Sequence, residues 1–293
     1  MKFPRLENQT RGFTVIDLLV VIAIIAVLVV IQFPVFARAT SKSQGIYCLN
    51  NQKQLALAAI VYSQENQDNW VPNMPGQNIE WVAGNMDFNH ANTDNTNAPL
   101  LLNPAVSVMG LFVKDAKIYH CPADESFISG EGARVRSVSM NQAVGTVGVT
   151  TGSLAAGSPV NGQWLIGTDI GNSRQNTWRT YGKTSSMGVP GAANLWIFLD
   201  EHPDSINDAS FAVEVAQTGV FARIIDFPAS YHDGGCGISF ADGHAVIHKW
   251  IGSVIKPPIV NGGSSIGGGA STGISGDSVA DVMWLQLRTS AHE

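Results

Sequence analysis

The pattern of hydrophobic and polar positions changes sharply near the start of the chain. A short polar stretch is followed by a long apolar run at residues 13–33, in which Asp17 is the one charged residue. A run of this length is typical of a helix that crosses a membrane. The pattern therefore predicts a transmembrane helix over residues 13–36, and a chain that this helix holds at a membrane.

A helical period continues beyond the apolar run. A semi-apolar stripe recurs at alternating steps of four and three residues. Its members are Cys48, Gln52, Leu55, Ala59 and Tyr62. The segment is rich in good helix formers, so we expect a stalk helix over residues 37–66 that packs on a globular head. Two helices hinged at Pro34 are the open alternative.

Residues 67–293 show short apolar runs separated by Gly, Ser, Asn and Pro, which predicts an α+β head with a mainly antiparallel sheet. The clearest strand is at 195–199, and Asp242-Gly243 between two alternating runs predicts a hairpin. Further short strands are expected at 80–83, 118–121, 135–149, 163–168, 211–215 and 220–226, a partly helical segment at 100–113, a flexible one at 261–276, and a segment docking on the head at 281–288.

Composition narrows the classes of function. The formal net charge is −6, and 14% of the residues are charged. A general nucleic-acid-binding protein would need a basic face, so nucleic acid is not an expected partner. The 3 cysteines allow at most one internal disulfide. A Cys48–Cys121 bridge would tie the stalk helix to the head, and three unpaired buried thiols are the alternative.

The start of the chain carries a specific pattern. The segment Gly12-Phe13-Thr14-Val15-Ile16-Asp17, followed by the apolar run, resembles the processing site of type IV pilins and type II secretion pseudopilins. The resemblance implies cleavage between Gly12 and Phe13 by a prepilin peptidase, methylation of Phe13, and removal of a leader at 1–12. A secretory signal cut near residue 38 is the minor alternative.

The same resemblance implies a location and partners. The protein would be a single-pass protein of the bacterial inner membrane, with a cytoplasmic leader and a periplasmic or extracytoplasmic head, which could end in a surface filament. Its partners would be membrane lipid and other pilin or pseudopilin subunits, joined through the helix. Asp17 stands where the family usually has Glu, and that acid is thought to meet the N-terminal amine of a neighbouring subunit. An acid near the headgroups without such a partner is the alternative.

A second resemblance covers the C-terminal part. His232, followed by nine residues and Asp242-Gly243, is similar to a motif in a large bacterial family of prepilin-type proteins, largely of unknown function. Residues 199–208 and Cys121-Pro122-Ala123-Asp124 also look like that family. The bland interpretation gives Gly243 a positive φ in a turn and His232 a structural hydrogen bond.

Cofactor sites in the head have alternatives that the sequence leaves open. No cofactor is certain. Calcium is the one candidate, with oxygen ligands from Asp200, Glu201, Asp204, Asn207 and Asp208. An acidic turn that hydrogen-bonds its own backbone explains the same residues. A zinc set of His232, Cys236, His244 and His248 is disfavoured, because four residues along a strand span about 13 Å.

We therefore predict a structural subunit of a pilus-like or pseudopilus-like assembly, and no enzyme. A serine nucleophile at Ser239 would need a turn from strand to helix, which a hairpin does not provide. The alternative is a tethered head that binds calcium, or a glycan through Trp70 and Trp81. Tryptophans that pin a loop to the core are the simpler explanation of those two residues.

Overall fold

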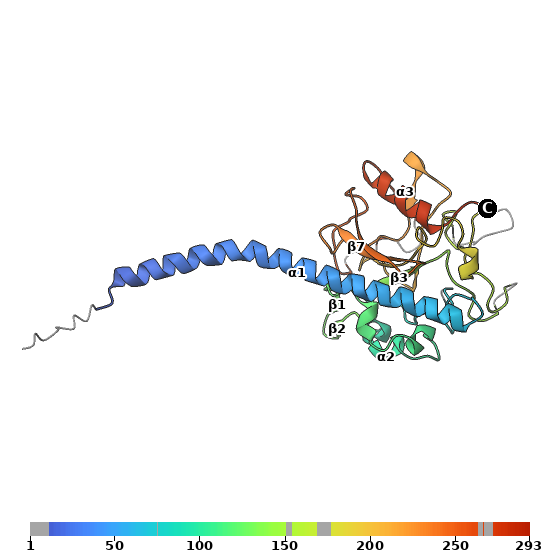
Figure 1. The fold of residues 1–293 in the computed structure, drawn as a ribbon, viewed down its shortest axis with the longest axis horizontal. Coiled ribbons are helices and arrows are strands. Elements are labelled where there is room, and N and C mark those ends of the chain that lie inside the picture. The colour runs from blue at the N-terminus through green and yellow to red at the C-terminus, as the bar shows by residue number, and fades with distance from the viewer. Residues whose placement is uncertain (1–11, 75, 151–153, 169–176, 263–265, 267–271) are drawn as a thin grey trace, which may run out of the picture. The chain divides into compact units, whose positions relative to one another are not determined.

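The computed structural model describes residues 12–74, 76–150, 154–168, 177–262, 266 and 272–293, without the side chains of residues 30–39. The chain divides into two compact units, Met1–Ser43 and Gln44–Glu293. Helix α1, Val15–Glu65, contributes to both. The second unit holds the sheet and the remaining elements (Figure 1).

The predicted fold with a membrane-spanning pilin-like helix needs correction. Among the described residues, no helix meets the length and apolarity that crossing a bilayer requires. The described side chains of the apolar run end at Val29. From Val15 to Val29 a helix rises about 22 Å, short of the roughly 30 Å of a bilayer's hydrocarbon core. The transmembrane assignment of residues 13–36 and the single-pass inner-membrane location are therefore not supported.

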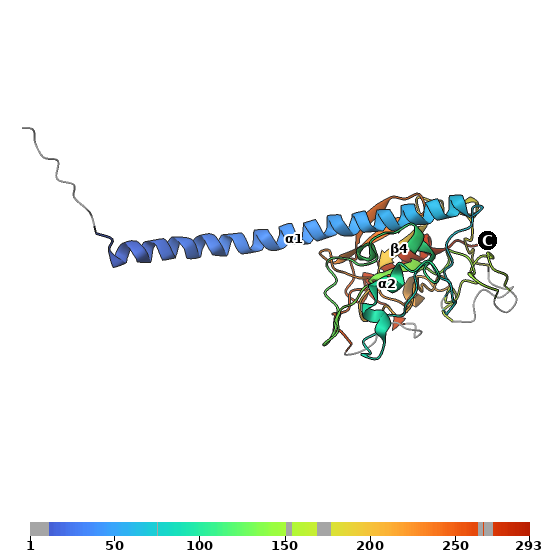
Figure 2. The same ribbon diagram turned by 90° about the horizontal axis from the view of Figure 1, so that it is seen from below.

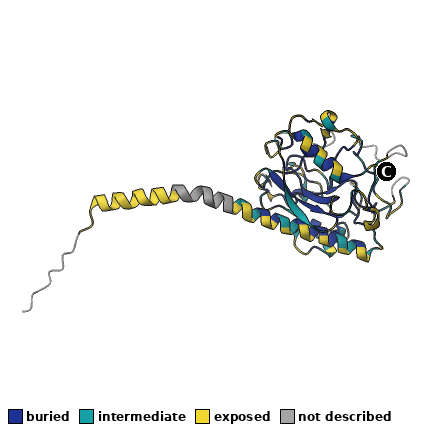
Figure 3. Ribbon diagram, turned by 45° about the horizontal axis from the view of Figure 1, so that its top comes forward, coloured by how far each residue is buried: buried dark blue, intermediate teal, exposed yellow. Residues whose placement is uncertain are grey.

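The stripe in the second half of α1 is largely buried within the second unit (Figure 3). Cys48, Gln52, Leu55 and Ala59 are each at most 1% exposed, while Leu57 and Val61 on the other side of the helix face outward. Periodicity thus predicted the packed face correctly. The second half of this helix contributes directly to the core of the second unit.

A five-stranded sheet forms the centre of the second unit, in the order β5-β3-β4-β7-β8. All pairs are antiparallel except β3 with β5. Its strands are β3 (Val138–Asn141), β4 (Trp196–Asp200), β5 (Ser210–Phe211), β7 (Gly235–Phe240) and β8 (Ala245–Lys249). The second half of α1 runs alongside this sheet, next to β4 (Figure 2).

The two faces of the sheet meet different helices. Gly237 and Ser239 of β7 face α1, where the Ser239 hydroxyl donates to Oε1 of Gln52 over 3.2 Å. Helix α3 (Ser278–Thr289) lies on the other face, where the Trp196 indole donates to Oγ1 of Thr289 over 3.0 Å. A register shift between Trp196 and Phe198 turns these two rings to opposite faces.

The β7–β8 hairpin is confirmed at Asp242-Gly243. Gly243 has a φ of +89°, which a residue with a side chain rarely adopts. Oδ1 of Asp242 accepts a hydrogen bond from the backbone N–H of His244 over 3.1 Å, which closes the turn locally. The tip packs on α1, where a Cβ at position 243 would lie 3.4 Å from Ile60.

Several short elements differ from the predictions. The strand expected at 118–121 is a 3-10 turn at Ala116–Tyr119, because the Asp115 side chain caps it by accepting the backbone N–H of Lys117. No strand forms at 163–168, and Glu80 makes one isolated bridge. The other elements are 3-10 turns at Thr93–Thr96, Val108–Leu111, Thr184–Ser186 and Gly219–Phe221, α2 (Ala98–Leu101), β1 (Phe127–Ile128), β2 (Gly132–Ala133), β6 (Arg223–Ile224) and β9 (Thr272–Gly273).

Candidate functional site

Four side chains of types that can bind a metal ion meet in the interior of the second unit. They come from four separate segments: Cys48 from α1, Cys121 from the turn after the Ala116–Tyr119 helix, Asp200 from the end of β4, and His232 from the loop before β7. One ligand atom of each lies within 4.8 Å of the others, and all four residues are buried. We call these four residues the Cys–His–Asp cluster.

Within the cluster the side chains form two close pairs. The Cys48 thiol donates a hydrogen bond to Oδ2 of Asp200 over 2.8 Å. The Cys121 sulfur lies 3.2 Å from Nε2 of His232. The backbone N–H of Gly237 also donates to Oδ2 of Asp200, over 3.1 Å. The carboxyl group is therefore fixed by both α1 and β7.

Side-chain amides on α1 hold the segment that carries Cys121. Nδ2 of Asn51 donates to the carbonyls of Lys117 and His120, each over 3.2 Å. Nε2 of Gln44 donates to the carbonyl of Pro122 over 3.1 Å. These bonds hold the chain on both sides of Cys121. Gln44 and Asn51 each lie about one helical turn from Cys48 on α1, so the bonds also fix Cys121 relative to Cys48.

Two glycines lie beside the cluster, and one of them, Gly237, makes room for it. A Cβ at Gly237 would collide with the Cys48 sulfur and lie 2.9 Å from Oδ2 of Asp200. At Gly45 a Cβ would lie 3.6 Å from Nδ1 of His232. The close approach of α1 to β7 at Gly237 thus depends on the missing side chain.

Burial favours the neutral forms of the groups in the cluster. It raises the pKa of Asp200 to about 7, against hydrogen bonds from Cys48 and Gly237 that lower it. The hydrogen bond with Cys121, together with burial, raises the pKa of Cys48 well above its usual range. Burial lowers the pKa of His232. Each shift favours the neutral form, as expected for groups removed from water.

The segment predicted to bind calcium does not form one cage. Asp200 belongs to the Cys–His–Asp cluster, and Glu201 accepts hydrogen bonds from Ser139 and Ser205. Asp204 accepts the backbone N–H groups of Val260 and Gly262 over 2.7 and 2.8 Å. The carboxylate oxygens of Asp200, Glu201 and Asp204 therefore accept hydrogen bonds from different parts of the protein and do not converge on one point.

The rest of that segment serves its own backbone. Oδ1 of Asp208 accepts from the N–H of Ser210 over 2.7 Å, and Oδ1 of Asn207 accepts from the N–H of Asp208 over 2.7 Å. Among the described residues, the one convergent group of His, Cys, Asp and Glu side chains is the Cys–His–Asp cluster. The geometry gives the calcium hypothesis no support, and the alternative of an acidic turn accounts for these contacts.

The disfavoured zinc set is also separated by the fold. Cys236 is buried beside Gly237, but alternation along β7 turns it to the opposite face of the sheet. The His244 ring stacks on Phe240, and the His248 ring stacks on Trp284 with centroids 3.7 Å apart. His232 is the member that reaches a metal-binding arrangement, with different partners.

The His232 to Asp242-Gly243 motif brackets one strand. His232 enters the cluster just before β7, whereas Asp242 and Gly243 form the turn just after it. The two ends of the motif therefore do different things, although they lie on the same strand connection. The spacing reflects the length of β7.

The cysteines do not form the predicted disulfide in this structure. Cys48, Cys121 and Cys236 are all free and buried. The hypothesis did identify a real neighbourhood, since Cys48 and Cys121 lie in one cluster. It missed Asp200 and His232, because nothing in the sequence shows that the end of β4 and the loop before β7 reach the same point.

At the other end of the chain, residues of the predicted processing site lie at and just before the start of α1. The Thr14 hydroxyl and backbone N–H donate to Oδ2 of Asp17 over 2.8 and 2.9 Å, and the Asp17 N–H donates to the Thr14 hydroxyl over 3.2 Å. This reciprocal arrangement caps the first turn of α1. Hydrogen bonds from the Thr14 backbone and side chain lower the pKa of the exposed Asp17 carboxyl group. Gly12 and Phe13 precede the helix and are exposed.

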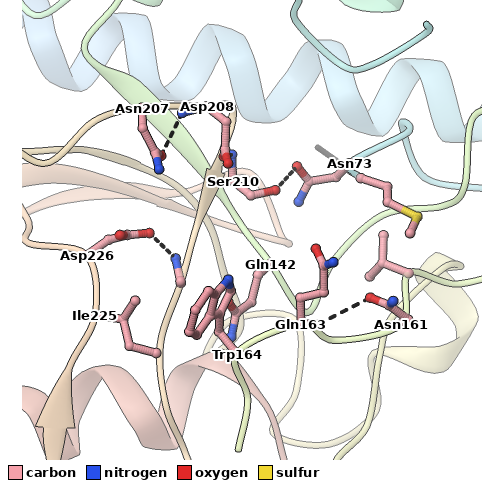
Figure 4. Close-up of a pocket in the computed structure, with 13 residues that line it drawn as sticks. Asn73, Gln142, Asn161, Gln163, Trp164, Asn207, Asp208, Ser210, Ile225 and Asp226 are labelled. Atoms are coloured by element: carbon pink, nitrogen blue, oxygen red, sulfur yellow. Dashed lines mark hydrogen bonds between the residues drawn. The ribbon is translucent and has the colours of Figure 1, made fainter. Parts of the chain in front are cut away.

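A cavity of about 190 Å³ opens near β5 (Figure 4). Amide side chains, Asp208, Asp226 and Trp164 surround it, with Gln142 beside the indole. Many of these polar groups already bond to the protein: Ser210 donates to Asn73, and Asp226 accepts the N–H of Ala212. The cavity is smaller than the roughly 300–1,000 Å³ of typical small-molecule sites.

The two tryptophans that the alternative hypothesis assigned to glycan binding are not available to a ligand. Trp70 and Trp81 are fully buried. Their indole N–H groups donate to the Thr184 hydroxyl and to the carbonyl of Ala209, each over 3.0 Å. They pin the loop after α1 to the core, as the simpler of the two sequence-based explanations had it.

Comparison with protein-family models, with curated proteins and with solved structures finds no match to this chain. Its function is therefore inferred from its own residues and geometry.

Proposed function

We propose that this protein is a prepilin-type structural subunit, cleaved by a prepilin peptidase between Gly12 and Phe13 and assembled with other subunits through the start of α1. The observation that carries the proposal is an exposed apolar helix directly after Gly12. The exposed side chains are Phe13, Val15, Ile16, Leu18, Leu19, Val20, Val21, Ile22, Ile24, Ile25, Val27, Leu28 and Val29.

An apolar surface of this extent favours a partner. These side chains lie all round the helix rather than on one stripe, and a helix that is apolar all round is normally buried. Each square ångström of apolar surface removed from water stabilises an assembly by about 25 cal/mol. Helices of other copies of the same kind are the occupants we propose, since they carry matching apolar surfaces on every side.

Asp17 fits a role in subunit contacts as well as in capping. Its carboxylate is exposed and its lowered pKa keeps it ionised at neutral pH. Cleavage after Gly12 would create a positively charged amine on Phe13 in each subunit. Opposite charges brought together as apolar helices pack would attract more strongly than in water, which favours one register between neighbours. We assign the head no catalytic role in this proposal.

Mass analysis of the mature N-terminus tests the processing step. We expect native protein to begin at Phe13, with the mass of one added methyl group. A Gly12→Leu variant should remain uncleaved and outside any assembly, while the fold stays intact, because a Cβ at position 12 meets nothing within 4 Å. Gly188→Leu is the matched control, with equally open surroundings. Native protein that still begins at Met1, or a Gly12→Leu protein that assembles normally, would contradict the proposal.

A further inference from the structure

The Cys–His–Asp cluster has the donor set of a metal site. Two thiols, an imidazole and a carboxyl group converge, all of them buried. Thiolate and imidazole ligands suit zinc, and carboxylate oxygen serves as a ligand in some zinc sites. We propose that Cys48, Cys121, Asp200 and His232 bind a structural zinc ion that fastens α1 to the sheet.

The distances fit a tetrahedral ion. Zinc bonds of about 2.3 Å to sulfur and about 2.0–2.2 Å to nitrogen and oxygen place neighbouring ligand atoms about 3.3–3.8 Å apart. The Cys48–Asp200 and Cys121–His232 pairs are at 2.8 and 3.2 Å, and all four ligand atoms lie within 4.8 Å of one another.

Charge supports a cation at this point. Zinc binding would release the protons of the Cys48 and Cys121 thiols, and the ion would offset two of the three negative charges of the two thiolates and the Asp200 carboxylate. The remaining charge is placed where donors already point at it. The Gly237 N–H donates to Oδ2 of Asp200 over 3.1 Å, and the Ser137 hydroxyl donates to Oδ1 over 3.4 Å. Such outer hydrogen bonds orient the ligands of metal sites.

A disulfide is the competing use of the two sulfurs, and it explains less of the geometry. A Cys48–Cys121 bond would remove the thiol hydrogen that Cys48 donates to the fully buried Asp200. The disulfide would also leave the buried His232 next to a disulfide sulfur, which is a weak acceptor. The other ring nitrogen, Nδ1, has no hydrogen-bond partner among the described residues. Zinc uses all four side chains, whereas the disulfide uses two, removes one of the hydrogen bonds to Asp200 and leaves the buried His232 poorly satisfied.

The site is closed, which indicates a structural ion. Four protein ligands fill a tetrahedron, whereas catalytic zinc keeps one position open for water or substrate. The ligands come from α1, the turn after the Ala116–Tyr119 helix, β4 and the loop before β7. One ion would therefore connect four segments that are far apart in sequence. This inference is independent of the proposed processing and assembly at Gly12.

Metal analysis of the full-length chain tests the proposal. The protein is purified without chelator from cells grown with added zinc, and its metal content and free thiols are measured together. We expect one zinc ion per chain and no Cys48–Cys121 disulfide. Replacement of zinc by Co²⁺ should give the intense visible bands of a tetrahedral ion and a thiolate-to-cobalt charge-transfer band, which report the ligands without any substitution.

Single substitutions assign the ligands. Cys48→Ser and Cys121→Ser should weaken zinc binding at least about 100-fold, since loss of outer-shell partners alone costs about 10–100-fold. Cys236→Ser is the matched control, because Cys236 is equally buried but lies on the opposite face of β7. It should keep both the zinc and the cobalt spectrum. The melting temperature of the wild type and of this control should rise on adding Zn²⁺ to metal-free protein, and that of Cys48→Ser should not.

Three results would overturn the proposal. The first is wild-type protein that takes up no stoichiometric zinc or Co²⁺ although its thiols are free. The second is a native Cys48–Cys121 disulfide found by mass analysis without reductant. The third is a cobalt spectrum that lacks the thiolate band, or one that Cys236→Ser abolishes as fully as Cys48→Ser does. If the cysteine variants fail to fold, the wild-type cobalt spectrum alone still decides.

Discussion

The thiol of Cys48 in α1 lies 2.8 Å from Oδ2 of Asp200 at the end of β4, although the two residues are 152 positions apart. Both groups are buried, and both have raised pKa values. This hydrogen bond joins the helix directly to the sheet. The contacts around it determine the cost of changing either element.

The close approach of α1 to β7 at Gly237 predicts that Gly237→Ala is destabilising. The added Cβ would collide with the Cys48 sulfur, so α1 or β7 would have to shift. Overpacking of a filled core costs about 1–3 kcal/mol, and we expect a loss of that size in the free energy of unfolding. Denaturant unfolding measures it. Gly273→Ala, where a Cβ meets nothing within 4 Å, should change little. Equal stability of the two variants would argue against this close contact.

The raised pKa of Glu80 predicts that the free energy of unfolding depends on pH. Burial, with a smaller contribution from Asp208, raises the pKa of Glu80 from 4.5 to about 7. The folded protein therefore holds this proton more tightly than the unfolded chain does. The resulting stability is complete below about pH 4.5 and is lost as the pH rises through 7.

Glu80→Gln removes this dependence, because the amide does not ionise. At pH 8 the variant should be more stable than the wild type by on the order of 2 kcal/mol, and at pH 4.5 the two should be nearly equal. Denaturant unfolding at both pH values makes the comparison. Glu125→Gln changes an exposed acid and serves as the control. A Glu80→Gln effect of the same size at both pH values would show that ionisation is not its cause.

Substitution of the buried Trp81 should lower the stability of the fold strongly. Its ring centroid lies 4.9 Å from that of Phe198, and its N–H donates to the carbonyl of Ala209. Trp81→Phe would leave a void and remove one of the two hydrogen bonds to the Ala209 carbonyl, which keeps the one from the Met140 N–H, and should cost about 2–4 kcal/mol. Thermal and denaturant unfolding measure the loss. Trp178→Phe, at a half-buried edge, should cost less. A Trp81→Phe protein as stable as the wild type would contradict this account of the core.

The two ends of the His232 to Asp242-Gly243 motif should separate on mutation. Gly243 has a φ of +89°, so Gly243→Ala should lower the free energy of unfolding by about 1 kcal/mol through backbone strain. Its zinc content, if the proposed site is correct, should stay unchanged. His232→Gln should lose zinc while the hairpin persists. Metal analysis and unfolding of both variants test this division, and loss of zinc from Gly243→Ala would show that the motif acts as one unit.

Local chemistry in the sequence predicted part of this fold. The helical stripe through Cys48 and Leu55 is the buried face of α1, and Asp242-Gly243 is the hairpin turn. In both cases short-range spacing fixes the geometry. The strand predicted at 118–121 was wrong because the Asp115 cap, which favours a helical turn, outweighed a β-favouring run.

The candidate site needed long-range information that spacing does not contain. Cys48 and Cys121 could be paired on paper, but Asp200 appeared to belong to an acidic turn with Asp204 and Asp208. The register of β4 with β7 places Asp200 beside Gly237 instead, on the face that meets α1. Only the paired sheet determines which neighbouring acids share a face. The membrane-spanning prediction rested on length and apolarity alone, and the described helix residues do not meet that criterion.

The second half of α1 supplies Leu55, Ala56 and Ala59 to the interior of Gln44–Glu293. A shortened chain that begins after Glu65 would therefore lack the helix that covers β4 and β7, and the apolar side chains beneath it would be exposed. A chain that begins at Gln44 would keep these side chains covered. The natural place to separate the leading segment from the body is thus within a continuous helix, at a position that secondary structure alone would never suggest.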